Sequence, residues 1–342
     1  MLKEIAIMRP LLIVQLVVYH AFIVYWGGWN PPMGYKDIAL YGHIAGWSYA
    51  YMLESFTFMS GYVWLYTCQQ MGVGGLKSMI LKKTKRLLIP MFFFGIVYFV
   101  CFMEYKSFPN ALYEVLNGAG HLWYLPMLFW CFVEAWLLKQ IKVDERIKLI
   151  VVALLAVFCS ELPIPFRIAT SFYYLFFFYL PVLLVGEREH IYKTVNKNPL
   201  RILIAAWVAF IFAFVLIRYV WQYPHSIDGM PMVHKAAMLS LNRGMQLVYS
   251  TLGVIAFYLT AVFLSKTSEL TSKGTLLVKI GSYCFGVYIF QQFVLKGFYF
   301  YTSIPEIVGP YWLPWLGVAL AIVISFVLTY LIRLTKVGRA IL

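Results

Sequence analysis

Residues 8–26 read MRPLLIVQLVVYHAFIVYW, an apolar stretch long enough to cross a lipid bilayer as a helix. Two ionisable side chains interrupt it, because Arg9 lies near its start and His20 lies well inside. Ionisable groups within a membrane are costly and usually mark a functional site. The stretch therefore predicts a membrane protein whose first span carries a functional imidazole.

The composition of the whole chain indicates the same class of protein. Of 342 residues, 62% are hydrophobic and 12% are charged, whereas a soluble domain is about 25% charged. We therefore expect a single all-α, polytopic membrane domain over residues 1–342, with no separate soluble domain. The net charge of +14 is spread between apolar blocks, which argues against a nucleic-acid partner. The five scattered cysteines predict neither a metal site nor a disulfide framework.

Ten apolar segments can be marked, and they predict about ten transmembrane helices, of which the fifth is short. The segments are 10–26, 44–66, 87–105, 122–138, 149–160, 170–186, 201–221, 245–265, 279–300 and 312–332. With the N-terminus inside, 21 lysines and arginines fall in inward segments and five in outward loops. This bias predicts a multi-pass protein of the cell (inner or plasma) membrane with both termini in the cytoplasm. The longest gap, 222–244, is then an external loop.

Arg9 and His20 are predicted to share one face of the first helix. Eleven residues at 100° each complete three turns plus about 20°, and they separate the two side chains by about 16 Å along the axis. Pro10 is expected in the first turn, where it costs no hydrogen bond. One alternative remains open for each residue: Arg9 would only anchor the helix, and His20 would only bond a neighbouring helix.

Three further segments carry candidate residues, each with a plainer alternative. Ser60 and Gly61 offer a place where another group can approach the backbone closely, or they serve helix packing. The basic run with Lys82, Lys83, Lys85 and Arg86 forms a phosphate clamp, or it reflects only the inward bias of positive charge. His121, Trp123 and Tyr124 begin the fourth helix on the outer side, where an aromatic belt explains the last two but not the histidine.

Taken in order, these features resemble the acyltransferase 3 family of integral-membrane acyltransferases. The resemblance is carried by Arg9 and His20, then FTFMSGY, KKTKR followed by LLIP, HLWYLP, and the late IGSYCFGVYIFQQ, and it runs through almost the whole chain. It implies an enzyme that moves an acyl group, acetyl or succinyl, from cytoplasmic acyl-CoA to a hydroxyl of a cell-surface glycan or lipid-linked sugar. Acyl-CoA would be a co-substrate, and no permanently bound cofactor is expected.

The resemblance also assigns roles to individual residues. Arg9 and His20 correspond to the family's essential arginine and histidine, and Lys83 and Arg86 occupy the ends of its usual Arg-x-x-Arg. Lysine at the first position keeps the charge but loses bidentate recognition. Arg9, Ser60, Gly61, Lys83 and Arg86 are then expected to bind acyl-CoA. His121, Trp123, Tyr124 and Gln291 are expected to bind the acceptor; the family often has a histidine near Gln291, and this chain has none there.

A neutral imidazole at position 20 would take the proton from the acceptor hydroxyl. Counting depth along the predicted helices, we expect Glu54, rather than Glu134, to orient this imidazole as the carboxylate does in hydrolase triads. Glu54 could instead pair with a lysine or arginine of another helix. A tunnel from the cytoplasm is expected along Arg9, Ser60, Lys83 and Arg86, with an outward cleft near His20.

Two other classes of protein remain as alternatives at this point. A transporter or exporter of a glycan or lipid precursor would also use about ten spans and charges near the membrane midplane. Helices broken at matched positions in two halves would favour transport, and the sequence shows none. A catalytically inactive relative acting as a membrane partner is the other alternative, which the presence of both Arg9 and His20 disfavours.

Overall fold

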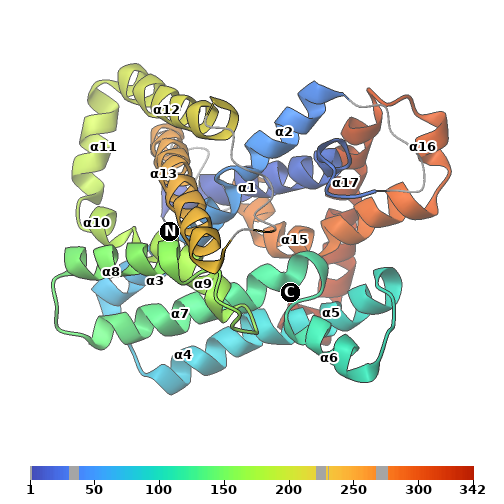
Figure 1. Cartoon of the computed structure of the whole chain (residues 1–342), viewed down its shortest axis with the longest axis horizontal. Coiled ribbons are helices and arrows are strands. Elements are labelled where there is room, and N and C mark those ends of the chain that lie inside the picture. Colours follow the sequence, from blue (N-terminus) through green and yellow to red (C-terminus); the bar gives the residue numbers. More distant parts are fainter. Residues whose placement is uncertain (1, 31–37, 221–228, 230, 267–275) are drawn as a thin grey trace. The chain divides into compact units, whose positions relative to one another are not determined.

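The computed structural model describes residues 2–30, 38–220, 229, 231–266 and 276–342, and in this part of the chain every regular element is a helix (Figure 1). Among the described residues, seven helical stretches are long and apolar enough to cross a membrane: Lys3–Trp26, Leu76–Phe102, Gly120–Gln140, Ile168–Val185, Pro199–Val220, Met232–Leu264 and Leu313–Leu334. The all-α, multi-pass membrane fold is therefore confirmed. The count of about ten spans and the side on which the termini lie stay predictions.

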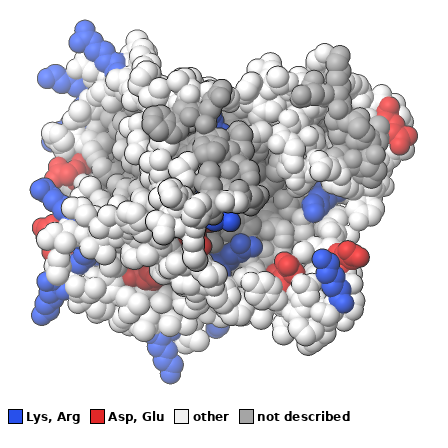
Figure 2. Space-filling view, in the orientation of Figure 1, with Lys and Arg blue, Asp and Glu red and all other residues white. Residues whose placement is uncertain are grey.

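The apolar surface fits contact with lipid. On α12 (Pro199–Val215), Ile204, Val208 and Phe212 are all exposed although the helix is strongly apolar. Their spacing of four residues places them on one stripe of the helix. In the face drawn in Figure 2, lysines, arginines and acidic residues are sparse among uncharged side chains. Such a surface would be unstable in water and is stable against acyl chains.

The described residues form two compact units, each assembled from stretches that are distant in the sequence. One unit comprises Met1–Met8, Leu53–Lys82 and Pro126–Thr267, and the other comprises Arg9–Met52, Lys83–Leu125 and Ser268–Leu342. We call them unit 1 and unit 2. Neither is a continuous segment of sequence, and the expectation of one domain over residues 1–342 stays a prediction.

Most helices of unit 1 follow one another along the chain. They are α3 (Met52–Met71), α4 (Leu76–Lys83), α7 (Tyr124–Gln140), α8 (Glu145–Phe158), α9 (Ile168–Tyr179), α10 (Val182–Val185), α11 (Arg188–Lys197), α12, η4 (Leu216–Val220) and α13 (Met232–Leu264). The antiparallel neighbours α12 and α13 pack together, as do α8 and α9.

Unit 2 holds most of α1 and the last helices of the chain. Its elements are α1 (Lys3–Phe22), η1 (Ile23–Trp26), α2 (Ala39–Tyr49), the π-helical turn η2 (Thr84–Leu88), α5 (Ile89–Phe102), α6 (Phe108–Leu116), η3 (Gly120–Trp123), α15 (Leu276–Tyr301), α16 (Ile304–Ile307), α17 (Leu313–Leu334) and α18 (Lys336–Ile341).

Three boundaries differ from those expected from hydropathy. The segment 44–66 is not one helix but two, α2 and α3, because the N–H of Ala50 bonds the carbonyl of Trp47 in a tighter turn that closes α2. Helix α13 begins at Met232, so much of the predicted loop 222–244 is helical; residues 221–228 and 230 lie outside the described part. An ion pair between Arg243 and Glu161 ties this additional helical stretch to the end of α8.

The expectation for Pro10 is also wrong. Helix α1 begins at Lys3, so Pro10 lies inside the helix rather than in its first turn. The helix extends this far because Glu4, which is fully buried, forms a bidentate ion pair with Arg188 of α11. The two bonds measure 2.8 and 3.0 Å, and Tyr192 donates a third at 2.7 Å. A paired carboxylate of this kind stabilises an extra turn that hydropathy does not reveal.

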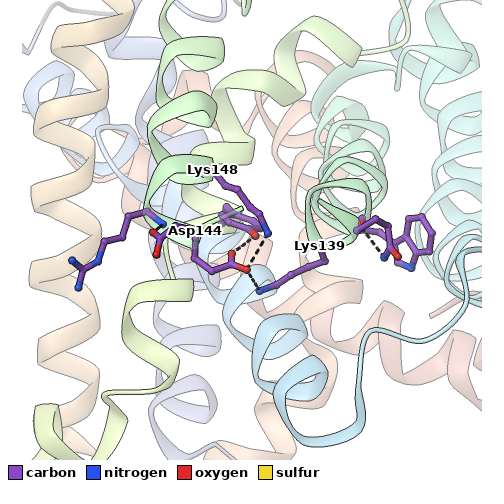
Figure 3. Close-up of polar contacts among 8 residues, drawn as sticks. Lys139, Asp144 and Lys148 are labelled. Atoms are coloured by element: carbon purple, nitrogen blue, oxygen red, sulfur yellow. Dashed lines mark hydrogen bonds and ion pairs between the residues drawn. The ribbon is translucent and has the colours of Figure 1, made fainter. Parts of the chain in front are cut away.

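A second charged cluster joins α7 to α8 (Figure 3). Glu145, the first residue of α8, accepts hydrogen bonds from Lys139 at 3.0 Å and Lys148 at 3.2 Å, and also from the Tyr179 hydroxyl. Burial alone would raise the pKa of Glu145, but these hydrogen bonds hold it below its ordinary value. Asp144 caps the helix by accepting a bond from the N–H of Arg146. Basic residues of this predicted inward loop therefore also stabilise a helix start.

Gly61 marks the closest approach between two helices of unit 1. A Cβ atom built there would lie 1.9 Å from the backbone oxygen of Phe178 in α9. The space beside Gly61 is thus filled by a neighbouring backbone, which is the helix-packing arrangement. Ser60 donates a hydrogen bond to the carbonyl of Phe56 within its own helix.

In unit 2, helices α1, α5 and α15 run in the same direction. Between α1 and α15, Arg9 interacts electrostatically with Cys284, His20 lies near Gln291, and Ala21 accepts a hydrogen bond from Tyr299. Just beyond η1, Trp29 lies near Lys296 of α15. The contacts of α5 with α15 are Phe94 with Phe290, Tyr98 with Phe293 and Phe102 with Tyr301. Residue numbers rise together in both sets, so the helices are parallel. Against α17 they fall, since Tyr283 contacts Arg333 and Tyr299 lies beside Gly317.

These directions are the ones that alternating spans require. Helices α1, α5 and α15 contain the first, third and ninth predicted spans, and α17 contains the tenth. An odd number of crossings must separate two parallel spans, so α3 between α1 and α5 has to cross once. Between α5 and α15 the number is odd only if the short helix α8 crosses as well. The directions thus support a count of ten.

We predict that replacing Gly61 by alanine destabilises the protein by roughly 1–3 kcal/mol, because a methyl group cannot enter against a backbone oxygen. The measurement is thermal unfolding of the detergent-purified protein. Gly281→Ala on α15 is the matched control, since nothing lies within 4 Å of a Cβ there. Equal melting temperatures for the two variants would contradict the close approach.

The crossing of α8 can be tested by single-cysteine labelling of intact cells, after replacement of the five natural cysteines. With ten spans, a cysteine at Leu162 reacts with a membrane-impermeant maleimide, and one at Lys142 reacts only after permeabilisation. Lys106→Cys serves as an outward reference. If positions 142 and 162 react alike, α8 does not cross.

Candidate active site

Arg9 and His20 both face α15, at two levels of the same helix pair. Arg9 lies near Cys284 and His20 near Gln291. His20 is 6% exposed, so its imidazole is enclosed by protein rather than turned to lipid. Eleven residues of helix separate the two side chains by about 16 Å along the axis. Unit 2 therefore holds a guanidinium and a buried imidazole along one helix–helix contact.

Rings surround the imidazole of His20. The ring of Trp29 stacks on it, with centroids 5.9 Å apart and planes 10° apart. Tyr19 lies on another side at 4.9 Å, and the ring of His121 meets it edge-on at 6.3 Å. The Nδ1 atom is buried and has no hydrogen-bond partner among the described residues. A buried ring nitrogen without a partner is costly, which makes this position a candidate for binding a substrate group.

Gln291 presents a second set of unused polar atoms to the same place. Its side chain is fully buried and interacts with the His20 imidazole, and neither its amide oxygen nor its amide nitrogen forms a close, well-aligned hydrogen bond with the described part of the chain. Buried amides are nearly always bonded. Two neighbouring side chains thus keep donors and acceptors available in a protein-lined environment.

His121 is in contrast fully engaged with α15. Its Nδ1 lies 2.9 Å from Oε1 of Gln292, and its Nε2 lies 2.9 Å from the carbonyl oxygen of Ile289. The backbone N–H of His121 donates to the same Oε1 at 3.2 Å, and Tyr288 donates its hydroxyl to the backbone oxygen of His121. These bonds fasten η3 to α15 beside His20.

Both ring nitrogens of His121 face carbonyl oxygens. The backbone N–H can bond only an acceptor, which identifies the Gln292 atom as oxygen. A neutral imidazole has one N–H, and only the imidazolium donates from both nitrogens. A neutral imidazole therefore donates one of these two ring hydrogen bonds, and the tautomer decides which one. For His121 to bind an acceptor as expected, one of these bonds would have to exchange, and that role stays a prediction.

The other two expected acceptor residues lie close to this cluster. Tyr124 is buried, and its ring centroid lies 6.2 Å from those of Trp123 and Tyr288. Trp123 is half-buried. Both residues are held by aromatic packing, and their contact with an acceptor stays a prediction.

At the other end of this contact, Arg9 is half-buried and lies close enough to Arg86 for the two like charges to interact. Arg9 has no ion pair or hydrogen bond with any residue that the structure describes. Arg86 is exposed on the π-helical turn η2, whose first residue follows the half-buried Lys83. Two neighbouring guanidinium groups, those of Arg9 and Arg86, favour an anionic ligand.

Glu54, Ser60 and Gly61 belong to unit 1. Glu54 lies in the first turn of α3, near its N-terminus rather than midway, because the predicted single helix is two. Its Oε1 accepts hydrogen bonds from Tyr173 at 3.1 Å and Ser250 at 3.5 Å. Glu134 likewise accepts a bond from Ser171 at 2.6 Å. Orientation of His20 by Glu54, and contact of Ser60 and Gly61 with the donor, stay predictions.

Sequence reasoning missed three residues of this cluster: Trp29, Gln292 and Lys296. The usable signal was the helical period, since Gln291 and Lys296 lie five residues apart and Gln292 and Lys296 four apart on one helix.

Gln291 and Gln292 provide a matched pair of variants. Gln292→Leu should lower stability by roughly 1–3 kcal/mol, because the N–H groups of His121 lose their acceptor. Gln291→Leu should leave thermal stability unchanged or raised, because that amide has no protein partner, while lowering activity. Melting temperatures and turnover of the purified variants test this. Equal losses of stability would contradict the assignment of a structural and a functional glutamine.

Comparison with known proteins identifies the family of the chain. Residues 2–334 match the model of the acyltransferase 3 family, described as an acyltransferase domain. No curated protein and no solved structure was found to match the chain. The match spans nearly the whole chain and includes every candidate residue named above. The chain therefore belongs to the acyltransferase 3 family and is a multi-pass membrane acyltransferase that transfers groups other than amino-acyl groups.

Proposed function

We propose that the protein is an O-acyltransferase of the cell membrane that moves an acetyl or succinyl group from cytoplasmic acyl-CoA to a hydroxyl of a surface glycan or a lipid-linked sugar. The observation that carries the proposal is a pair of buried polar groups that lie together without a close, well-aligned hydrogen bond, Nδ1 of His20 and the amide of Gln291, along one helix contact from an unpaired Arg9. Membership of an acyltransferase family supplies the reaction type.

The inner end of this contact suits the donor. Coenzyme A carries phosphates at one end and a thioester at the end of a long, thin arm. Arg9 and Arg86, with Lys83, would bind the phosphates, because guanidinium groups match phosphate oxygens. Three helical turns, about 16 Å, lead from Arg9 to His20, which is a distance that the arm can span. The thioester then reaches the imidazole.

The chemistry at His20 is general-base catalysis. The imidazole takes the proton of the acceptor hydroxyl as its oxygen forms a bond to the thioester carbon. The amide N–H of Gln291 donates to the carbonyl oxygen, on which negative charge develops. The carbon–sulfur bond then breaks, and the imidazolium returns the proton to the leaving thiolate. The products are an ester and free coenzyme A.

The test uses the full-length protein in nanodiscs with acetyl-CoA or succinyl-CoA and a saccharide acceptor, with release of coenzyme A and ester formation both measured. His20→Ala should lower turnover by about 10²–10⁴-fold, the usual contribution of a general base. Arg9→Gln should mainly raise KM for acyl-CoA, and Arg9→Lys should do so less. The exposed histidine in His190→Gln is the control. Unchanged turnover in His20→Ala would rule out the mechanism.

Glu54→Gln tests the expected orientation of His20. If the carboxylate holds the imidazole, turnover falls while KM for acyl-CoA stays the same. Tyr173→Phe is the companion variant, since it removes the hydroxyl that bonds Glu54. Unchanged turnover in Glu54→Gln would contradict the expectation that Glu54 orients His20.

A further inference from the structure

Lys296 is a charged side chain inside α15 that the proposed reaction does not use. It lies five residues beyond Gln291, which places it about 7.5 Å farther along the helix axis, on the side away from Arg9. Its side chain is half-buried. A lysine within a membrane-spanning helix is costly unless something compensates its charge, so the surroundings of this ammonium need an explanation.

Three aromatic rings surround the ammonium. The Nζ atom lies 5.9 Å from the ring centroid of Trp29, 5.1 Å from that of Tyr98 and 5.6 Å from that of Phe102. These rings come from three different parts of unit 2: the segment after η1, the middle of α5 and the end of α5. Cation–π attraction holds the charge in place, but ring faces accept none of its N–H bonds in the way that an oxygen does.

The ammonium keeps its hydrogen-bonding capacity. Three N–H donors are present on a lysine, and Lys296 forms no hydrogen bond or ion pair with any residue in the described ranges. The rings fix its position while leaving its donors available. A cation with a fixed position and no counter-ion is suited to bind an anion from outside the protein.

Trp29 connects this cation to the reaction centre. Its ring centroid lies 5.9 Å from the centroid of the His20 imidazole and also 5.9 Å from Nζ of Lys296. The tryptophan therefore lies beside both the imidazole and the ammonium. A molecule that places its hydroxyl at His20 and follows the tryptophan brings its next substituents to Lys296. Sugars often stack on such rings through their apolar faces.

We propose that Lys296 binds a carboxylate or phosphate of the substrate, so that the enzyme selects an acceptor that carries an anionic group on the same sugar as the reacting hydroxyl or on the adjacent one. This inference rests on the proposed function, because it adds a substrate class to the same site. The anionic group belongs to the acceptor, since the donor phosphates are assigned to the opposite end at Arg9. A dicarboxylic acyl group such as succinyl is the other source of the same chemistry.

Binding is measured first, because it needs no turnover. The probes are a galacturonic-acid trisaccharide, glucose 1-phosphate and the neutral maltotriose, titrated into full-length protein in nanodiscs. The wild-type protein should bind at least one charged probe about tenfold more tightly than maltotriose, which corresponds to about 1.4 kcal/mol. Lys296→Gln should lose this preference, and Lys296→Arg should retain most of it.

Two controls separate charge recognition from folding. Lys279→Gln removes the same charge from an exposed position of the same helix and should bind as the wild type does. Lys296→Met keeps the length of the side chain, so it replaces Lys296→Gln if the glutamine variant unfolds at a lower temperature than the wild type. The expected result is a Lys296 variant that has the melting temperature of the wild type and binds charged and neutral probes with equal affinity.

Turnover then identifies the source of the anion. If the anion belongs to the acceptor, Lys296→Gln raises KM for charged acceptors about tenfold with either acetyl-CoA or succinyl-CoA, and neutral acceptors are unaffected. If it belongs to the acyl group, the variant impairs succinyl-CoA alone, with any acceptor. Equal effects on charged and neutral acceptors with both donors would overturn the inference.

The two proposals fail in different ways. If binding is charge-selective and depends on Lys296 but the wild type transfers no acyl group, only the proposed function is contradicted. Acyl transfer lost in His20→Ala, with no charge preference in the wild-type protein, would sink the present inference alone.

Discussion

The candidate site is organised around the parallel contact between α1 and α15. In hydrocarbon a polar side chain has no water to bond, so it must find a partner in the protein or stay costly. Along this contact some groups find partners and some do not. His121 is bonded through Gln292 and Ile289, whereas His20 and Gln291 keep unused atoms. The contrast between bonded and unbonded neighbours distinguishes scaffold from reactive groups.

The unbonded groups are held in place by packing instead of by hydrogen bonds. Trp29 and Tyr19 enclose the imidazole, and the fastening of His121 to α15 fixes the adjoining turn. Donors fixed in a dry environment act strongly on a developing charge because they need not reorganise. The same low polarity makes each of them expensive to keep.

Much of this arrangement could be predicted from the sequence. Hydropathy identifies the membrane-spanning helices, and the helical period alone places Arg9 and His20 on one face of the first helix. Three kinds of feature could not be predicted. Ion pairs accompany the extension of α1 back to Lys3 and of α13 back to Met232, which hydropathy does not predict. A break without proline or glycine at Ala50 moved Glu54 from mid-helix to a helix start. Pairings such as His121 with Gln292 join residues whose separation no local period encodes.

Contacts between residues far apart in the sequence have a consequence for the synthesis and insertion of the protein. Tyr299 bonds the carbonyl of Ala21 across 278 residues of chain, and Gln291 reaches His20 over a similar span. While the ribosome makes the intervening segments, the first helix lies in the bilayer without the contacts of its imidazole with α15. Long-range closure of this kind is slow and exposes the nascent chain to mispairing. The contact between α1 and α15 therefore forms only after α15, the penultimate long helix, has been inserted.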